Sequence, residues 1–486
     1  MGSAVIAGIV ALYFIFLLLI ARVTSKGADN NSFFVGNKNS PWYLVAFGMI
    51  GTSLSGVTFI SVPGWVGTSQ FSYLQMVLGY LLGYIVVANV LMPLYYRLNL
   101  TSIYTYLDQR FGFWSYKTGA FYFLLSRTIG AAFRLYLVAN VLQIAIFDDW
   151  NIPYYLTVAI TILLIWVYTA KGGIKTIVWT DALQTLFMLL AVGVGIYQIG
   201  DQLNLGFSEI ISTVKDSEYS QIFFFDDWKA SNYFWKQFLS GAFITIVMTG
   251  LDQDMMQKNL SCKNIKEAKW NMFSMSVVLV FVNLLFLGLG ALLFIYSNKN
   301  GIALPEKGDD LFPGLALNNT LGISVAVFFI LGLIAAAYSS ADSALTALTT
   351  SVCVDFLNVK DKPEIEGQRL RKRTHIIMSV VLYVVILIFS LISDDSVISS
   401  LFKVAGYTYG PLLGLYAFGL LHKSQLKDKW VPLVCLLCPV ICYVIQVNSE
   451  EWLNGYKFGY ELLMLNGLLT YLGLHVVRRK ELTKSV

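Results

Sequence analysis

Hydroxyl side chains and one carboxylate interrupt a long apolar stretch in the second half of the chain. Ser339, Ser340, Asp342 and Ser343 follow the apolar residues 335–338 directly. At membrane depth such groups, and any exposed carbonyls, have no water to satisfy them, and a desolvated cation is their natural partner. We therefore interpret this run as part of a sodium site.

A second apolar stretch, residues 48–64, combines several glycines, Pro63 and many hydroxyl side chains. Glycine tolerates non-helical dihedral angles and proline removes a backbone donor, so the stretch predicts a helix that is unwound inside the membrane. The carbonyls freed by the break are ligands for a small hard cation. The alternative is an ordinary kinked helix that packs through its small residues.

A third stretch, residues 248–258, has a polar break around Asp252 and Gln253. It lies five membrane spans after the stretch with Pro63. Two interrupted helices at corresponding positions of two halves predict an inverted-repeat transporter, with its site between the halves. The repeat rests on hydropathy alone, because the two halves show no convincing sequence identity.

The composition predicts the elements that position these groups. Of the 486 residues 57% are hydrophobic and 13% are charged, and the mean hydropathy is +0.65. The chain is therefore predicted to be an all-α integral membrane protein, because a crossing needs about 20 apolar residues. Thirteen stretches meet this need: 3–22, 41–66, 72–97, 118–146, 152–170, 176–200, 234–257, 268–297, 318–353, 374–393, 396–421, 430–447 and 456–477.

Basic residues gather in every second predicted loop, for example in the loop that begins at Lys258, whereas acidic pairs such as Asp148-Asp149 fall in the others. This asymmetry predicts an outside amino terminus and a cytoplasmic carboxyl terminus. The first span has no basic residue before it, so it is expected to remain as a helix rather than to be cleaved. We expect a multi-pass protein of the plasma (inner) membrane, in contact with the lipid bilayer and with no nucleic-acid partner.

The spans divide the chain into five predicted parts. These are an extra amino-terminal helix with the first cytoplasmic loop (1–40), repeat one (41–200), an external loop (201–233), repeat two (234–421), and carboxyl-terminal helices with a short cytoplasmic tail (422–486).

Other functions find little support in the sequence. There is no phosphate-binding loop and no zinc-protease motif, and a catalytic constellation at membrane depth is missing, so an enzyme is not expected. An ion channel requires a continuous polar pore and does not require paired helix breaks. A sensor module of the same helical type stays an alternative, although no output domain follows the last span.

Four segments resemble the sodium/solute symporter family. They are residues 172–184, residues 252–258, residues 336–343 and residues 410–415. They occur in the family's order at matching spans, and the resemblance covers nearly the whole chain. It implies a fold similar to the leucine-transporter fold, with two repeats of five helices, one extra helix before them and two after them.

The resemblance also implies ligands for the sodium site that this family shares. They are the carbonyls of Gly51, Leu54 and Ala336 and the hydroxyls of Ser339 and Ser340. Five neutral oxygens suit sodium, a hard monovalent ion. In the alternative interpretation the two serines only pack, or bond back to carbonyls one turn earlier.

Asp181 is an intramembrane carboxylate, which is a functional hypothesis by default. In family members that use two sodium ions, an Asp at this place helps to hold the additional ion, so Asp181 with Ser340 and Ser343 is a candidate second site. A structural ion pair with Arg127 or Arg134 is the alternative.

The solute is expected beside the helix break. The candidate residues are Thr58, Gln75, Asp252, Gln253 and Lys403. The sugar carriers of the family have Glu where this chain has Leu74 and Asn where it has Asp252, which weakens a prediction of galactose-like sugars. Lys403 is a candidate partner for an anionic solute; its alternatives are snorkelling and a pair with Asp342.

The resulting expectation is sodium-coupled uptake of a small organic solute by alternating access, with one or two sodium ions, no organic cofactor and a functional monomer. The solute is a sugar, a carboxylate such as a monocarboxylate or sialic acid, or a similar molecule. The alternatives are a proton-coupled carrier and a membrane sensor or receptor of the same fold.

Overall fold

The computed structural model describes residues 2–26, 29–318, 320–391 and 397–479. Within them the regular structure is helical, apart from two isolated bridges, Ser40 with Cys262 and Leu426 with Arg478. An all-helical architecture is what the bilayer requires, because a helix satisfies its own backbone groups where no water is present. The predicted end of the tenth span at 392–393, the predicted start of the eleventh span at 396 and the predicted tail after Arg479 lie outside the described residues.

The helices follow one another in this order: α1 (Ser3–Thr24), α2 (Asn30–Val35), η1 (Gly36–Lys38), α3 (Trp42–Ser69), α4 (Tyr73–Val86), η2 (Val87–Leu91), α5 (Met92–Arg97), α6 (Thr105–Arg110), α7 (Phe113–Leu142), η3 (Gln143–Phe147), α8 (Tyr154–Gly172), α9 (Ile174–Gln202), α10 (Phe207–Lys215), α11 (Phe234–Thr245), η4 (Ile246–Gly250), α12 (Gln253–Asn259), α13 (Ile265–Lys299), η5 (Gly308–Asp310), α14 (Leu311–Leu317), α15 (Ile323–Ser351), η6 (Val352–Phe356), η7 (Val359–Asp361), α16 (Glu364–Ser390), α17 (Val397–Leu421), η8 (Asp428–Trp430), α18 (Val431–Val447), α19 (Ser449–Trp452) and α20 (Leu462–Val476).

Each of the thirteen predicted spans coincides with a helix or a pair of helices. Among the described residues, ten helices are long and apolar enough to cross a membrane, and a bent pair, Phe234–Gly250 with Gln253–Asn259, makes up to eleven. The remaining two predicted spans are shorter apolar helices, Tyr154–Ala170 and Leu462–Val476. The predicted membrane fold is confirmed, whereas the boundaries between the two repeats stay a prediction.

Both predicted helix breaks are present. In α3 the break falls at Ser55, whose φ of 59° and ψ of 174° are not helical. The second break bends the chain by 69° between η4 and α12. A helix that ends inside the bundle leaves its last carbonyls without regular partners. The first half of α3 therefore presents the carbonyls just before Ser55 to its surroundings.

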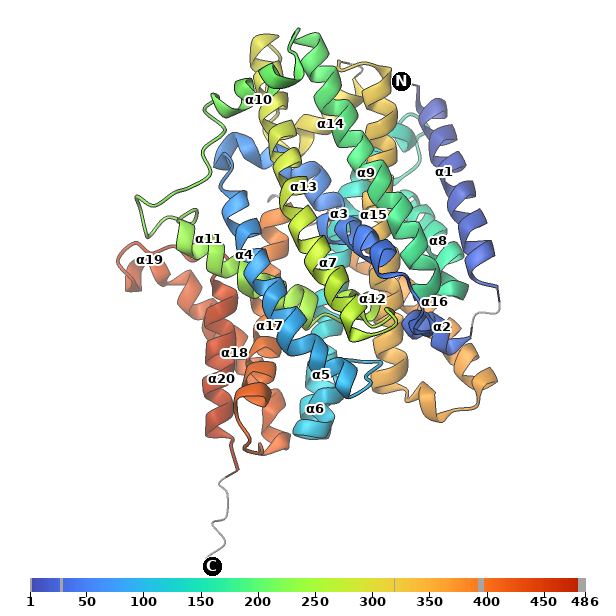
Figure 1. The fold of residues 1–486 in the computed structure, drawn as a ribbon, viewed down its shortest axis with the longest axis vertical. Helices are drawn as coiled ribbons and strands as arrows, with labels where there is room; N and C mark the ends of the chain where they lie inside the picture. Colours follow the sequence, from blue (N-terminus) through green and yellow to red (C-terminus); the bar gives the residue numbers. More distant parts are fainter. Residues whose placement is uncertain (1, 27–28, 319, 392–396, 480–486) are drawn as a thin grey trace, which may run out of the picture.

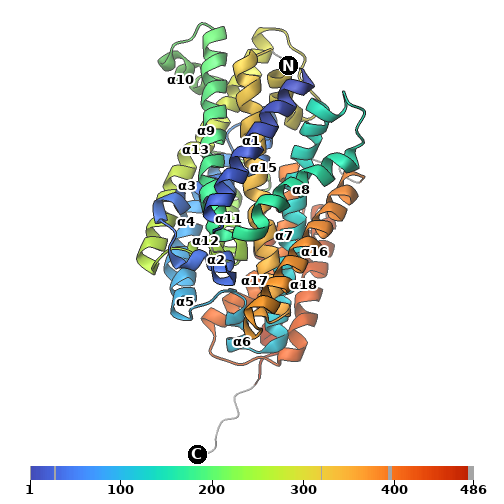
Figure 2. The same ribbon diagram turned by 90° about the vertical axis from the view of Figure 1, so that its right-hand side faces the viewer.

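The broken helix α3 lies in the centre of the molecule. It packs against α9, α13 and α15, and 89% of its most apolar window is buried. By contrast α1 lies on the outside of the bundle, against α8, α9 and α15, with 28% of its window buried (Figures 1 and 2). The chain thus wraps peripheral helices around a core that contains the first break.

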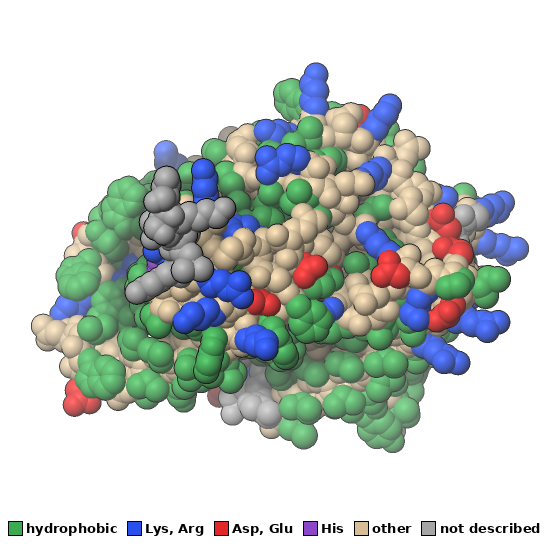
Figure 3. Space-filling model, turned by 90° about the horizontal axis from the view of Figure 1, so that it is seen from below, with side chains coloured by type: hydrophobic (Ala, Val, Ile, Leu, Met, Phe, Trp, Pro, Cys, Tyr) green, Lys and Arg blue, Asp and Glu red, His purple; other side chains and the backbone are tan. Residues whose placement is uncertain are grey.

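The first helix begins at one end of the molecule and the last helix ends at the opposite end (Figure 1). The odd number of spans predicted from the sequence is consistent with this arrangement. The end near the last helix carries many Lys and Arg side chains around its rim, with a few acidic groups between them (Figure 3). This end is the one that the loop charges predict to be cytoplasmic.

Candidate sodium and solute site

The five predicted sodium ligands lie on α3 and α15, which pack against each other. All five residues are buried: Gly51, Leu54, Ala336, Ser339 and Ser340. The Ser340 hydroxyl has no hydrogen-bond partner in the structure, although a buried hydroxyl normally has one. An orphan oxygen beside a helix with free carbonyls fits a small cation that takes oxygen ligands.

The Ser339 hydroxyl donates a hydrogen bond to Asp181 Oδ1 (2.7 Å) and lies 3.2 Å from Thr52 Oγ1. A hydroxyl has one hydrogen and two lone pairs. Because the hydrogen is directed at Asp181, the lone pairs of Ser339 remain available as acceptors. This geometry keeps Ser339 suitable as a cation ligand.

The carboxylate of Asp181 on α9 pairs with a lysine. Its Oδ2 lies 2.6 Å from Lys258 Nζ, and both side chains are 1% exposed. Lys258 Nζ also donates to Thr52 Oγ1 (2.5 Å). Asp181 does form an ion pair, but with Lys258 rather than with Arg127 or Arg134. The prediction that Lys258 belongs to a loop is wrong. The 69° bend before α12 directs this helix into the core, and Lys258 lies buried in its last turn.

The residues proposed for a second sodium do not bond to one another in the structure. Ser343 donates to Asp342 Oδ1 (3.2 Å), and Asp342 Oδ2 accepts a hydrogen bond from Tyr168 (2.8 Å). Asp342 is fully buried. Its partners are therefore hydroxyl groups, whereas Asp181 has an ammonium. The second sodium stays a prediction.

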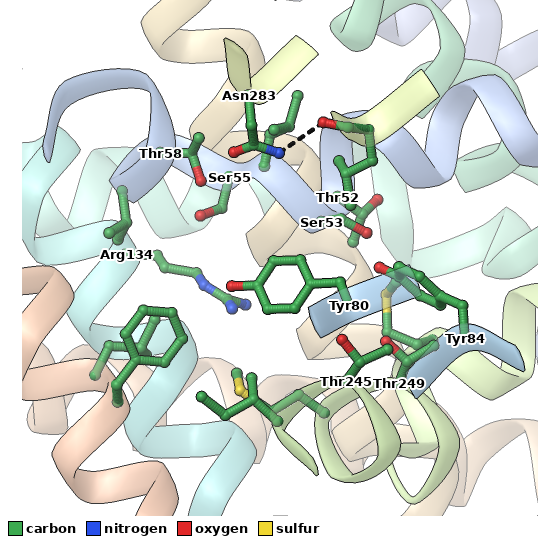
Figure 4. A pocket seen from close by; sticks show the side chains of 18 of the residues that line it. Thr52, Ser53, Ser55, Thr58, Tyr80, Tyr84, Arg134, Thr245, Thr249 and Asn283 are labelled. Atoms are coloured by element: carbon green, nitrogen blue, oxygen red, sulfur yellow. Dashed lines mark hydrogen bonds between the residues drawn. The ribbon is translucent and has the colours of Figure 1, made fainter. Parts of the chain in front are cut away.

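A cavity lies directly beside the break in α3 (Figure 4). Its α3 wall is lined by Thr52, Ser53, Leu54, Ser55, Val57 and Thr58. Hydroxyl groups of Tyr80, Tyr84, Thr245 and Thr249 face it from α4 and from the α11–η4 segment. Apolar residues such as Met248 and Phe402 complete the lining. The cavity therefore offers many hydrogen-bonding groups on an apolar background, as solute sites commonly do.

Two arginines of α7, Arg127 and Arg134, also line the cavity, but their surroundings differ. The Arg127 guanidinium pairs with Asp254 in α12 and lies 3.9 Å from Asp252. For Arg134 no carboxylate lies within ion-pair distance among the described residues, and its Nε and Nη1 are buried without hydrogen-bond partners. Figure 4 shows Arg134 pointing into the cavity beside Ser55, Thr58 and Tyr80. The cavity thus holds one buried guanidinium that no carboxylate contacts directly.

Of the five predicted solute residues, Thr58 lines this cavity. Gln75 donates to Asn232 O (2.9 Å), and Gln253 donates to Thr101 O (2.7 Å), so both amides hold loops. Asp252 accepts a hydrogen bond from Tyr409 (2.5 Å). Lys403 is exposed on α17, next to the cavity residue Phe402. Their role in solute binding stays a prediction.

From the sequence, Arg134 was expected only as a candidate partner for Asp181, whereas the structure places it at the cavity. The sequence did hold a signal for this role, because an intramembrane arginine is itself a functional hypothesis.

Comparisons with known proteins agree with this geometry. Residues 33–424 match the model of the Sodium:solute symporter family. The sodium/sialic acid symporter NanT of Aliivibrio fischeri is 27% identical over 89% of this chain and 85% of its own length. The human sodium/iodide cotransporter is 25% identical over 82% of this chain and 62% of its own length.

Among solved structures, a Na⁺-coupled sialic acid symporter in a substrate-bound outward-open state is similar, with a TM-score of 0.82 at 20% identity over 97% of both chains. The fold of this chain is therefore that of a leucine-transporter-like symporter. With a family match over most of its length, the chain belongs to the sodium:solute symporter family and couples the uptake of a solute across the membrane to sodium.

Proposed function

We propose that this symporter takes up a small organic solute with a carboxylate group, and that Arg134 binds this carboxylate. The observation that carries the proposal is the buried guanidinium of Arg134, which faces the cavity without an acidic partner. Burying an unpaired charge costs free energy, and an anionic solute relieves this cost when it binds. Bidentate pairing with a carboxylate suits the planar guanidinium.

The rest of the cavity supports a solute that also carries hydroxyl or amide groups. Thr58 and Asn283 line the same cavity as Arg134, and the side-chain oxygen Oδ1 of Asn283 has no hydrogen-bond partner in the structure. Relatives that carry sialic acid and monocarboxylates support the same class. Iodide, which the name of another relative gives, is an inorganic anion that the same charge attracts.

Coupling between sodium and solute follows because the same segment of α3 borders both binding sites. Leu54 belongs to the proposed sodium ligands and also lines the cavity. Sodium at Gly51, Leu54, Ala336, Ser339 and Ser340 therefore fixes the broken segment of α3 that the solute contacts. An ion that stabilises one arrangement of this segment raises the affinity for the solute, and the solute raises the affinity for sodium by the same factor.

The driving force depends on charge balance. One sodium ion with one carboxylate moves no net charge, so only the concentration gradient of sodium drives uptake. A tenfold sodium gradient supplies about 1.4 kcal/mol, enough to concentrate the solute about tenfold. Each further sodium ion adds roughly 2.3 kcal/mol per 100 mV of membrane potential.

The test is thermal unfolding of the purified protein with sialic acid, short monocarboxylates, neutral sugars and iodide, each with sodium or with choline. We expect a carboxylate to raise the melting temperature in sodium only. Arg134→Gln should abolish this shift, Arg134→Lys should keep part of it, and the exposed control Arg369→Gln should keep all of it.

A neutral solute that stabilises wild type and Arg134→Gln equally would refute the proposal that the solute carries a carboxylate bound by Arg134. It would leave the coupling to sodium intact. Solute binding that ignores sodium would favour the proton-coupled alternative. Binding without uptake into proteoliposomes would favour a sensor.

A further inference from the structure

A groove on the outside of the bundle, separate from the cavity at Arg134, lies between the end of α1 and the beginning of α9. Its lining residues are Leu19, Ile20, Val23 and Thr24 of α1 and Lys175 and Trp179 of α9. Its walls are therefore mostly apolar, with one ammonium group at the edge. Figure 2 shows α1 on the outer surface of the molecule, with α9 beside it.

Two contacts close the groove at its polar end. The hydroxyls of Thr24 and Thr176 lie 2.8 Å apart and join the two helix ends. Lys175 Nζ donates to the carbonyl of Lys26, 3.4 Å away. An ammonium has three N–H donors, so Lys175 can bind a further acceptor at the same time. The groove is thus a built feature of the fold and not a gap between loose helices.

The polar end of the groove is positively charged. Arg22 lies in the last turn of α1, Lys26 follows the end of this helix, and Lys175 lies in the first turn of α9. The nearest acidic residue in the chain, Asp29, is engaged elsewhere, because its carboxylate caps α2 by accepting a hydrogen bond from Ser32 N (2.7 Å). Bonds from Ser32 lower the pKa of Asp29 and stabilise its charge in that cap. Asp29 offsets one of the three basic charges, so the polar end keeps a net positive charge.

The groove also lies at the depth of a lipid headgroup. With its 22 residues α1 is about 33 Å long, close to the roughly 30 Å hydrocarbon core of a bilayer. Its last turns thus reach the membrane–water interface. Trp179, 50% exposed, and Val23, 68% exposed, face outward there. A Trp beside Lys and Arg is typical of an interfacial anchor.

We propose that this groove binds one anionic phospholipid. An acyl chain lies along Leu19, Val23 and Trp179, and the phosphate lies beside Lys175 and Lys26. Charge complementarity selects an anionic over a zwitterionic lipid, because the basic groups attract net negative charge at the surface. The bound lipid fills the space between α9 and the weakly buried α1, and so fastens α1 to the bundle.

The test uses the full-length protein in nanodiscs of phosphatidylcholine with phosphatidylglycerol that has brominated chains, which quench nearby tryptophans. We expect the Trp179 signal, taken as the difference between wild type and Trp179→Phe, to be quenched more than the lipid ratio alone predicts. Lys175→Gln should reduce this enrichment about fivefold, the effect of one basic group near the surface. Lys429→Gln, an exposed lysine elsewhere, is the control and should not change it.

Val23→Phe tests the apolar part, because it fills the groove from an exposed position without adding a tryptophan, and it should displace the lipid while the protein still melts as wild type does. Equal quenching by brominated phosphatidylcholine and phosphatidylglycerol would overturn the proposal. Enrichment that survives both Lys175→Gln and Val23→Phe would overturn it as well. Neither result bears on sodium binding or on Arg134.

Discussion

The ammonium of Lys258 lies 2.6 Å from the carboxylate of Asp181 in the buried centre of the protein. The two residues come from α12 and α9, and Thr52 of α3 and Ser339 of α15 bond to the same pair. Four helices thus meet at one ion pair next to the proposed sodium ligands. The pair provides Asp181 with a counter-ion that belongs to the chain itself.

Removal of one partner of this pair should be costly. We expect Lys258→Met to destabilise the protein by about 3–5 kcal/mol, because it leaves a buried carboxylate without compensation. The double variant Lys258→Met/Asp181→Asn should recover much of that loss. A double-mutant cycle on melting temperatures measures the coupling, and additive effects of the two changes would contradict a direct pair.

Gly51 should tolerate no side chain. A Cβ there would lie 2.3 Å from Thr185 Oγ1 of α9, so Gly51→Ala must push the two helices apart. We expect a loss of about 1–3 kcal/mol and weaker sodium binding. Gly193→Ala on α9 is the matched control, since its Cβ meets nothing within 4 Å and should be neutral or slightly stabilising. Equal effects of the two changes in thermal unfolding would refute the close approach.

The two arginines of α7 should respond in opposite ways. Arg127→Met removes the partner of the buried Asp254 and should lower the melting temperature. Arg134→Met removes a buried guanidinium that has no acidic partner, so without solute it should leave the melting temperature unchanged or raise it, while it abolishes solute binding. A lower melting temperature for Arg134→Met than for Arg127→Met would contradict this prediction, because it would mean that Arg134, rather than Arg127, has the more important carboxylate partner.

Hydrophobic runs predicted each membrane helix, because bilayer thickness imposes a length that local composition reveals. The break in α3 was also predictable, since glycines and Pro63 weaken a helix locally. Its position at Ser55 was not, because the sequence offers several glycines at which the backbone can leave the helix.

The partners of the charged residues were beyond the sequence. Lys258 appeared to open a basic loop, but the 69° bend before α12 brings it to Asp181, and only tertiary packing determines that bend. The amides of Gln75 and Gln253 appeared suited to a solute, yet they bind loop carbonyls. The sequence therefore predicted which polar residues lie inside the membrane. Which groups these residues contact depends on tertiary packing and could not be predicted from residue type.

The most direct test of the account is binding of radioactive sodium to purified wild type, Ser340→Ala and the control Ser297→Ala. Both serines are buried and have no hydrogen-bond partner, but only Ser340 belongs to the proposed site. We predict saturable sodium binding in wild type and Ser297→Ala and its loss in a folded Ser340→Ala. Unchanged sodium binding in Ser340→Ala would contradict a sodium site between α3 and α15.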